Sequence, residues 1–268
     1  MLRRTMVVAV SLIGTARGAA QSPVAAGVTV GVAQLSAART EQVVTGVLQL
    51  RPRPWLALSA IPSAIRLSHD TSGATVASGG LGDLPLVAGA TATLPAPWTP
   101  TLGGALIVSL PTGDAACGFG SGETTLGIDA GLGVAPASRL RFSADASRNL
   151  SGIAGPSLLR LEGAADVAPR WTLGVGVGAE VGTGDSLARS VGGGITRALA
   201  GAMALTVNAS HGLTAASARW VVSVGIGTVY SGISPVAPTS PLRRLQGSFA
   251  GGVGRGGGHG NGKAGACS

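Results

Sequence analysis

The charged side chains in the middle of the chain are the residues best suited to do chemistry. Only 11% of the 268 residues are Asp, Glu, Lys or Arg. Seven of these charged residues, of both signs, recur within one stretch: Asp129, Arg141, Asp145, Arg160, Glu162, Asp166 and Glu180. Two roles are open for them. They could line a polar track along which ions or solutes pass, or form a ladder of ion pairs that fills the interior and stabilises it.

No residue pattern predicts catalysis, a metal ion or a cofactor. The chain has 3 histidines, and His211 directly follows Ser210. Neighbouring residues of a strand point to opposite faces, so this pair would not serve as base and nucleophile. The 2 cysteines and the histidines have no spacing typical of a metal-ligand set. We therefore expect no enzyme activity and no cofactor.

The elements that carry the charges are predicted to be β-strands, because the dominant sequence period is two. Between Trp171 and Val181, apolar residues alternate with Thr172, glycines and Glu180. About twelve segments share this pattern, with 10 to 14 possible because glycine-rich strands specify register weakly. They lie near residues 24–34, 41–51, 54–61, 80–92, 102–110, 123–134, 139–149, 157–167, 170–181, 188–198, 202–212 and 219–230.

The connections predict how these strands close. Tight turns follow the second, sixth, eighth and tenth strands, whereas the alternate connections are mostly longer, including loops 62–79 and 111–122. Short turns at one end, longer loops at the other and an even strand number are typical of an all-β, antiparallel transmembrane β-barrel of the bacterial outer membrane. Three tryptophans, Trp55, Trp98 and Trp171, fall at the short-turn ends, and Trp220 falls at the other end. The alternative is a secreted soluble β protein, which the scarcity of surface charge disfavours.

Composition divides the chain into three parts. Residues 1–20 have the basic start, apolar centre and small-residue end of a secretory signal peptide. Residues 21–230, the predicted barrel, carry 12 basic and 11 acidic residues, so the high isoelectric point gives no reason to expect nucleic-acid binding. Residues 231–268 form a Pro- and Gly-rich basic tail that is too polar to fold alone. We expect a disordered periplasmic end, with lipid or peptidoglycan contact and a plug as alternatives.

The two cysteines are expected to stay apart. Cys117 lies in a predicted external loop, whereas Cys267 lies in the tail on the periplasmic side. A bond between them would require the tail to cross the membrane. The sequence therefore predicts two unpaired thiols.

Short motifs at the predicted loop ends resemble a known family. They are Gly80-Leu81-Gly82-Asp83, Leu110-Pro111-Thr112-Gly113-Asp114, Gly120-Ser121-Gly122-Glu123 and Ser210-His211-Gly212-Leu213-Thr214. In order and spacing, over roughly residues 75–232, they resemble the outer-membrane family named for transport in the meta-pathway of phenol degradation. That resemblance implies a barrel that takes up small, often aromatic, compounds. From the residues alone, Gly82-Asp83 and Gly113-Asp114 are either turn residues or a solute contact at the mouth.

These observations predict a glycine-rich, porin-like channel of a Gram-negative outer membrane, with both termini periplasmic. Its solutes would be small, including aromatic or hydrophobic ones. The expected partners are outer-membrane lipid, the barrel-assembly machinery and an unidentified small solute, with no nucleic acid. A non-conducting structural or surface-interaction barrel with a packed lumen is the alternative.

Overall fold

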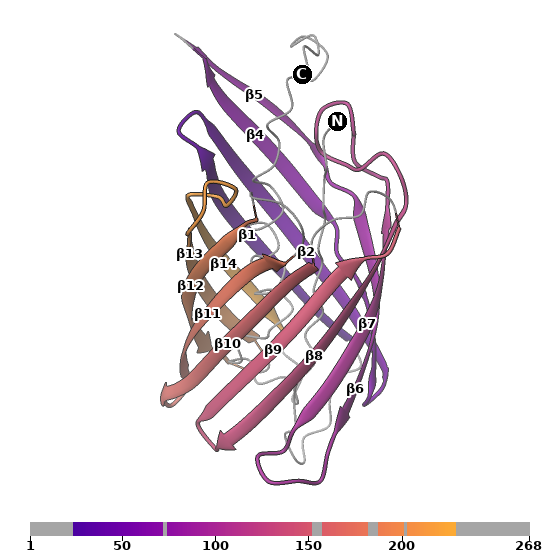
Figure 1. Ribbon diagram of the computed structural model, residues 1–268, viewed down its shortest axis with the longest axis vertical. Helices are drawn as coiled ribbons and strands as arrows, with labels where there is room; N and C mark the ends of the chain where they lie inside the picture. Colours follow the sequence, from indigo (N-terminus) through magenta and orange to yellow (C-terminus); the bar gives the residue numbers. More distant parts are fainter. Residues whose placement is uncertain (1–23, 72–73, 152–156, 182–186, 201–202, 229–268) are drawn as a thin grey trace.

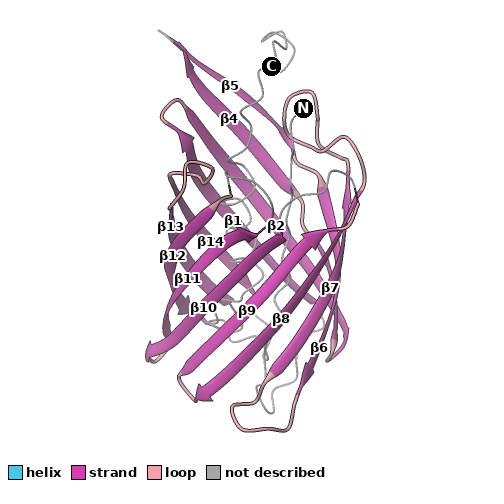
Figure 2. Ribbon diagram, in the orientation of Figure 1, coloured by secondary structure: helices cyan, strands magenta, loops and turns pink. Residues whose placement is uncertain are grey.

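The computed structural model describes residues 24–71, 74–151, 157–181, 187–200 and 203–228, and these form strands without helices (Figure 2). Every strand pairs antiparallel with its neighbours in one sheet. The strands are β1 (Val24–Ser36), β2 (Arg39–Arg53), β3 (Leu56–Ala60), β4 (Ser63–Thr71), β5 (Ala74–Leu81), β6 (Leu84–Thr93), β7 (Thr101–Leu110), β8 (Thr125–Ala137), β9 (Leu140–Asn149), β10 (Ser157–Ala168), β11 (Trp171–Val181), β12 (Arg189–Ala198), β13 (Met203–Gly212) and β14 (Trp220–Thr228).

The sheet closes into a barrel of twelve strands (Figure 1). Closure is made by β1, which pairs with β2 on one side and with β14 on the other. Two wall strands are each built from two segments. β3 and β4 pair with successive parts of β2, while β5 pairs with β4 and β6 pairs with β3. The predicted antiparallel barrel of about twelve strands is therefore confirmed.

The predicted loop 62–79 is wrong, because most of it is the β4–β5 hairpin. This hairpin rises above the rest of the wall in Figure 1. The expected loop begins at Pro62, which cannot donate a backbone hydrogen bond to a ladder. Here the ladder continues past it, because the Gly46 amide donates to the Pro62 carbonyl over 2.8 Å and the Ile61 amide donates to the Pro85 carbonyl over 3.0 Å. Pro62 and Pro85 each lack a backbone N–H donor, but the carbonyl of each still accepts a hydrogen bond from the neighbouring segment.

The two ends of the barrel differ as expected. Two-residue turns 54–55, 138–139 and 169–170 lie at one end, whereas the connections 111–124 and 213–219 lie at the other. The first hairpin is an exception, since residues 37–38 make a tight turn at the long-loop end. Trp55 and Trp98 are exposed in connections at the short-turn end, and the Trp171 ring lies 5.2 Å from the Arg197 guanidinium carbon there. Trp220 is at the opposite end, where its indole donates to Gln34.

The outer and inner faces of the wall have opposite chemistry. Outward residues such as Val175 and Val177 are 68% and 48% exposed. Inward residues such as Thr45 and Thr172 are each 1% exposed. An apolar outer belt on a sheet that closes on itself satisfies what hydrocarbon demands of a spanning protein. No helix in the described ranges is long and apolar enough to cross a membrane. The predicted signal peptide and basic tail lie outside the described residues.

Candidate functional site: the barrel interior and its mouth

A row of inward charges follows the adjacent strands β8, β9 and β10. Arg160 of β10 stands directly opposite Asp145 of β9. Asp145 in turn stands opposite Gly131 of β8, two residues from Asp129, so Asp129 is its diagonal neighbour on the same face. Asp129, Asp145 and Arg160 are 3%, 4% and 5% exposed. The strand register thus brings both signs of charge together on the inner wall.

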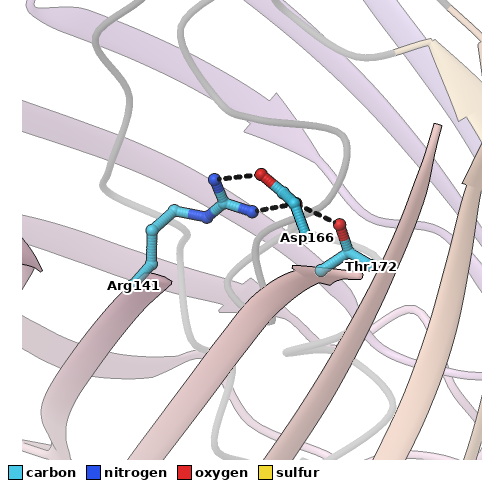
Figure 3. Close-up of polar contacts among 3 residues, drawn as sticks. All are labelled: Arg141, Asp166 and Thr172. Atoms are coloured by element: carbon cyan, nitrogen blue, oxygen red, sulfur yellow. Dashed lines mark hydrogen bonds and ion pairs between the residues drawn. The ribbon is translucent and has the colours of Figure 1, made fainter. Parts of the chain in front are cut away.

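Arg141, Asp166 and Thr172 form a polar cluster nearer the short-turn end (Figure 3). The Arg141 guanidinium donates two hydrogen bonds to Asp166, with Nη1···Oδ2 at 3.0 Å and Nη2···Oδ1 at 2.6 Å. The Thr172 hydroxyl of β11 also donates to Asp166 Oδ1. A bidentate pair of this kind fixes both side chains more firmly than a single contact does. The cluster therefore joins β9, β10 and β11 across the inner surface.

The remaining two predicted track residues differ from each other in environment. Glu162 of β10 lies inward, opposite Ser143 of β9 and Gly176 of β11. Glu180 lies near the long-loop end of β11, where its Oε2 accepts a hydrogen bond from the Ala188 amide over 2.8 Å. Glu180 therefore holds the two ends of the β11–β12 connection together in addition to facing the lumen.

The connection 111–124, which we call the mouth loop, is held to the wall by Asp83. The Asp83 side chain is 2% exposed and accepts backbone hydrogen bonds from Gly113 at 3.1 Å and Ser121 at 2.6 Å. The Thr112 hydroxyl adds a bond to the Gly82 carbonyl over 2.8 Å. One buried carboxylate thus binds both the beginning and the end of the mouth loop.

The mouth loop folds toward the inside of the barrel. Gly80 of β5 stands opposite Ile65 of β4, and Ile65 stands opposite the buried Val43 of β2, so all three positions face inward. A Cβ at Gly80 would lie 2.5 Å from the Phe119 ring, which is itself buried. Phe119 therefore packs against the inner face of β5.

The glycines of the motifs are required by this close packing. A Cβ at Gly113 would lie 2.6 Å from the Phe119 carbonyl oxygen, and one at Gly120 would collide with Asp83. No side chain fits at either position without moving the loop backbone. The motif residues meet at one place in the structure: Gly82 and Asp83 lie between β5 and β6 and bind the beginning of the mouth loop, which follows β7 and contains or adjoins Leu110, Pro111, Thr112, Gly113 and Asp114.

Asp114 shapes the turn that carries Cys117. Its Oδ1 accepts hydrogen bonds from the backbone amides of Ala116 at 2.8 Å and Cys117 at 3.2 Å, and its carbonyl accepts one from Phe119 at 2.8 Å. Cys117 is disulfide-bonded. The expectation of an unpaired thiol at this position is therefore wrong. Since Cys117 is the one cysteine among the described residues, its partner lies outside them.

Sequence reasoning singled out the motif residues but missed what joins them. Phe119 and the Ser121 amide received no role, although both complete the mouth loop. The sequence did offer a signal: the motifs beginning at Gly80, Leu110 and Gly120 all contain glycine, and Asp83 stands directly before a strand. That signal indicates a special backbone arrangement, but it does not say which carboxylate binds which amide.

The fold of this chain is similar to that of solved structures. No family model and no curated protein matches the chain. The solved structure of KdgM porin in complex with disordered oligogalacturonate matches with a TM-score of 0.53 and 10% identity, covering 76% of this chain and 98% of the porin. A second KdgM porin structure matches with a TM-score of 0.51 and 10% identity, covering 76% of this chain and 98% of the porin. The CymD monoaromatic hydrocarbon channel matches with a TM-score of only 0.42 and 10% identity, covering 78% of this chain and 89% of the channel. The chain thus has the fold of the outer-membrane β-barrels.

Proposed function

We propose that this chain is a channel of the bacterial outer membrane that passes small solutes along its charged inner wall. The observation that carries the proposal is the contrast between the two faces of a closed barrel. Outward valines such as Val175 lie exposed, while Asp129, Asp145 and Arg160 lie inside. Charges on the inner wall of a barrel contribute to the selectivity of a pore. The fold shared with porins supports the same function.

The orientation in the membrane follows from the two ends of the barrel. β1 begins at Val24, opposite Leu50, and β14 ends at Thr228, opposite Met203; both points lie at the short-turn end. Short turns of such barrels face the periplasm. The proposal therefore places both ends of the described chain on the periplasmic side and the mouth loop outside the cell.

The class of solute is the finer part of the proposal. The wall chemistry favours small hydrophilic or charged molecules, because Arg and carboxylate groups offer hydrogen bonds and ion pairing. The motif resemblance instead predicts small aromatic compounds. Both classes belong in a first assay.

A second candidate is a barrel whose lumen is packed and does not conduct. The observation that favours it is the low exposure of the inward charges, 3% at Asp129 and 5% at Arg160. An open lumen would leave such side chains in water. The two candidates differ in whether anything can pass.

The deciding experiment is conductance of the refolded protein in planar bilayers. Folding is checked first by migration of the unboiled protein on a gel, with a boiled sample as control. Current is recorded under oxidising conditions and again after reduction, since Cys117 is disulfide-bonded. Stepwise currents in either state support the channel. A correctly folded barrel that stays silent in both states overturns it, and solute competition with a sugar acid and with a phenol then distinguishes the solute classes.

A further inference from the structure

We infer that an outward-facing patch at the long-loop end of β12, β13 and β14 binds the phosphate groups of the glycolipid that forms the outer leaflet of a Gram-negative outer membrane. The patch consists of Arg189, His211 and Trp220, with Arg219 beside it, and we call it the outer patch. All four residues are exposed. The inference rests on the proposed placement in the outer membrane, and it holds whether or not the barrel conducts.

Strand alternation turns the side chains of the outer patch away from the lumen. Arg189 shares its face of β12 with Val191, which is 40% exposed. His211 shares its face of β13 with the exposed Val207, and Trp220 of β14 is itself 40% exposed. These residues therefore lie on the same outer surface as the apolar belt.

The strand register brings the outer patch together. His211 stands directly opposite Val191 of β12 and Trp220 of β14. Arg189 lies two residues beyond Val191 on the same face, so it is a diagonal neighbour of His211. Directly opposite residues have Cβ atoms about 4.5–5.5 Å apart and diagonal ones about 7–8 Å apart, within reach of long side chains. A guanidinium, an imidazole and an indole thus meet on three adjacent strands.

The backbone of the outer patch is held in place by the connection 213–219. The Arg189 amide donates to the Ser217 hydroxyl over 2.8 Å, and that hydroxyl donates to the Arg189 carbonyl over 2.5 Å. The Leu213 amide donates to the same carbonyl over 2.8 Å. The Trp220 indole is fixed by its hydrogen bond to Gln34. Because the patch is ordered before it binds, binding costs less conformational entropy.

The outer patch lies at the edge of the apolar belt. Arg189 and Arg197 are at opposite ends of β12 on its outer face, and only small or apolar residues lie between them on that face. Eight residues extend about 26 Å along a strand at about 3.3 Å per residue. The apolar band of such barrels is about 25 Å tall. An arginine keeps its methylene groups on apolar surface and extends its guanidinium into the polar layer. Arg189 therefore reaches the depth where lipid phosphates lie.

The charge of this region is suited to an anion. The strands β1, β12, β13 and β14 and the connection 213–219 contain no aspartate or glutamate. A guanidinium binds phosphate oxygens with two parallel hydrogen bonds. An imidazole offers an N–H donor in either charge state. Basic residues close to a membrane surface attract anionic lipid, and an indole is favoured at the same interface. A phosphate-bearing headgroup is therefore the occupant that these side chains fit.

The test measures binding of lipid A, the diphosphorylated part of the outer-leaflet glycolipid, to the full chain refolded in detergent. Folding is verified by migration of the unboiled protein on a gel, and bound lipid is counted by native mass spectrometry during a titration. We expect the wild type to bind lipid A more tightly than the dephosphorylated lipid. Arg189→Ala should weaken binding about fivefold, as expected for one basic residue at a membrane surface. His211→Ala should weaken binding as well, and provides an independent variant if Arg189→Ala does not fold.

Arg66→Ala is the matched control. Arg66 is an exposed arginine of β4 on the outer face of the wall, where it stands opposite Gln42 of β2 and Gly79 of β5. It has the same charge as Arg189, but no second cation or indole stands opposite it. The same substitution there should leave binding of lipid A at the wild-type level.

Two outcomes overturn the inference. Equal weakening by Arg66→Ala and Arg189→Ala would show that binding follows total charge, and equal binding of lipid A and its dephosphorylated form would show that phosphate is not recognised. Conductance gives a separate result. A folded barrel that conducts but does not bind lipid A refutes the outer patch alone, whereas a folded barrel that binds lipid A but never conducts refutes the channel alone. A chain that folds in buffer without detergent or lipid refutes both.

Discussion

Replacing Asp83 by Asn should release the mouth loop while leaving the wall intact. The carboxylate accepts the amides of Gly113 and Ser121 and is 2% exposed, so water does not replace it readily. A hydrogen bond to a charged group contributes about 1.5–3 kcal/mol, and a buried donor without a partner costs about 1–3 kcal/mol. Asparagine retains one acceptor oxygen but turns an amide group toward the second donor. We therefore expect the loop anchor to weaken by about 2–4 kcal/mol.

Hydrogen–deuterium exchange of the mouth loop measures this change directly. A loss of about 2–4 kcal/mol in the free energy of local opening corresponds to exchange about 30- to 700-fold faster at the Gly113 and Ser121 amides. Exchange in β9 and β10, away from the loop, should not change. In bilayers, the freed loop should produce additional flickering between current levels.

Asp70→Asn is the matched control for the anchor. Asp70 is exposed on the β4–β5 hairpin and accepts a 2.7 Å hydrogen bond from the Thr75 hydroxyl. The same chemical change there should leave the mouth loop protected. If Asp83→Asn exchanges at the wild-type rate, or if both variants accelerate the loop equally, Asp83 is not the anchor.

Three further substitutions test the wall. Val177→Arg places a charge on the outer belt, where Val177 is 48% exposed, and should lower the free energy of unfolding from lipid by about 2–4 kcal/mol. The control, Val177→Leu, should leave this free energy close to that of the wild type. If Val177→Arg also left it unchanged, the outward facing of Val177 on β11 would be wrong. Arg141→Ala breaks the bidentate pair with Asp166 and should lower the free energy of unfolding in urea by about 1.5–3 kcal/mol. A variant as stable as the wild type would show that the pair contributes nothing to stability. Arg160→Ala should shift ion selectivity with little loss of stability in a wet pore, but should destabilise a packed lumen by leaving acidic neighbours without it; an effect on neither quantity refutes both roles of the charged wall.

The sequence predicted the wall of this protein well because a strand's period depends on neighbouring residues alone. Alternation placed Val175 and Val177 outward and Thr172 inward, and the structure agrees. The same reasoning missed the β4–β5 hairpin, which begins directly after Pro62. Proline has no amide hydrogen to donate, but its carbonyl still accepts, and the bond from the Gly46 amide to the Pro62 carbonyl continues the ladder here.

The mouth loop could not be predicted in the same way, because it depends on contacts between residues far apart in the chain. Asp83 binds Ser121, which is 38 positions away, and Gly80 contacts Phe119. Local patterns identify each motif as a place where the backbone bends. They do not reveal that three such places share one carboxylate. The motif resemblance marked these positions in order, and the structure supplies the physical reason for their spacing.

The mouth loop and the charged inner wall are held in place by separate sets of contacts. The loop is fixed by one buried carboxylate, Asp83, and its turn at Asp114 presents Cys117. A contact made at Cys117 is therefore mechanically linked to the wall at β6 through a short run of hydrogen bonds.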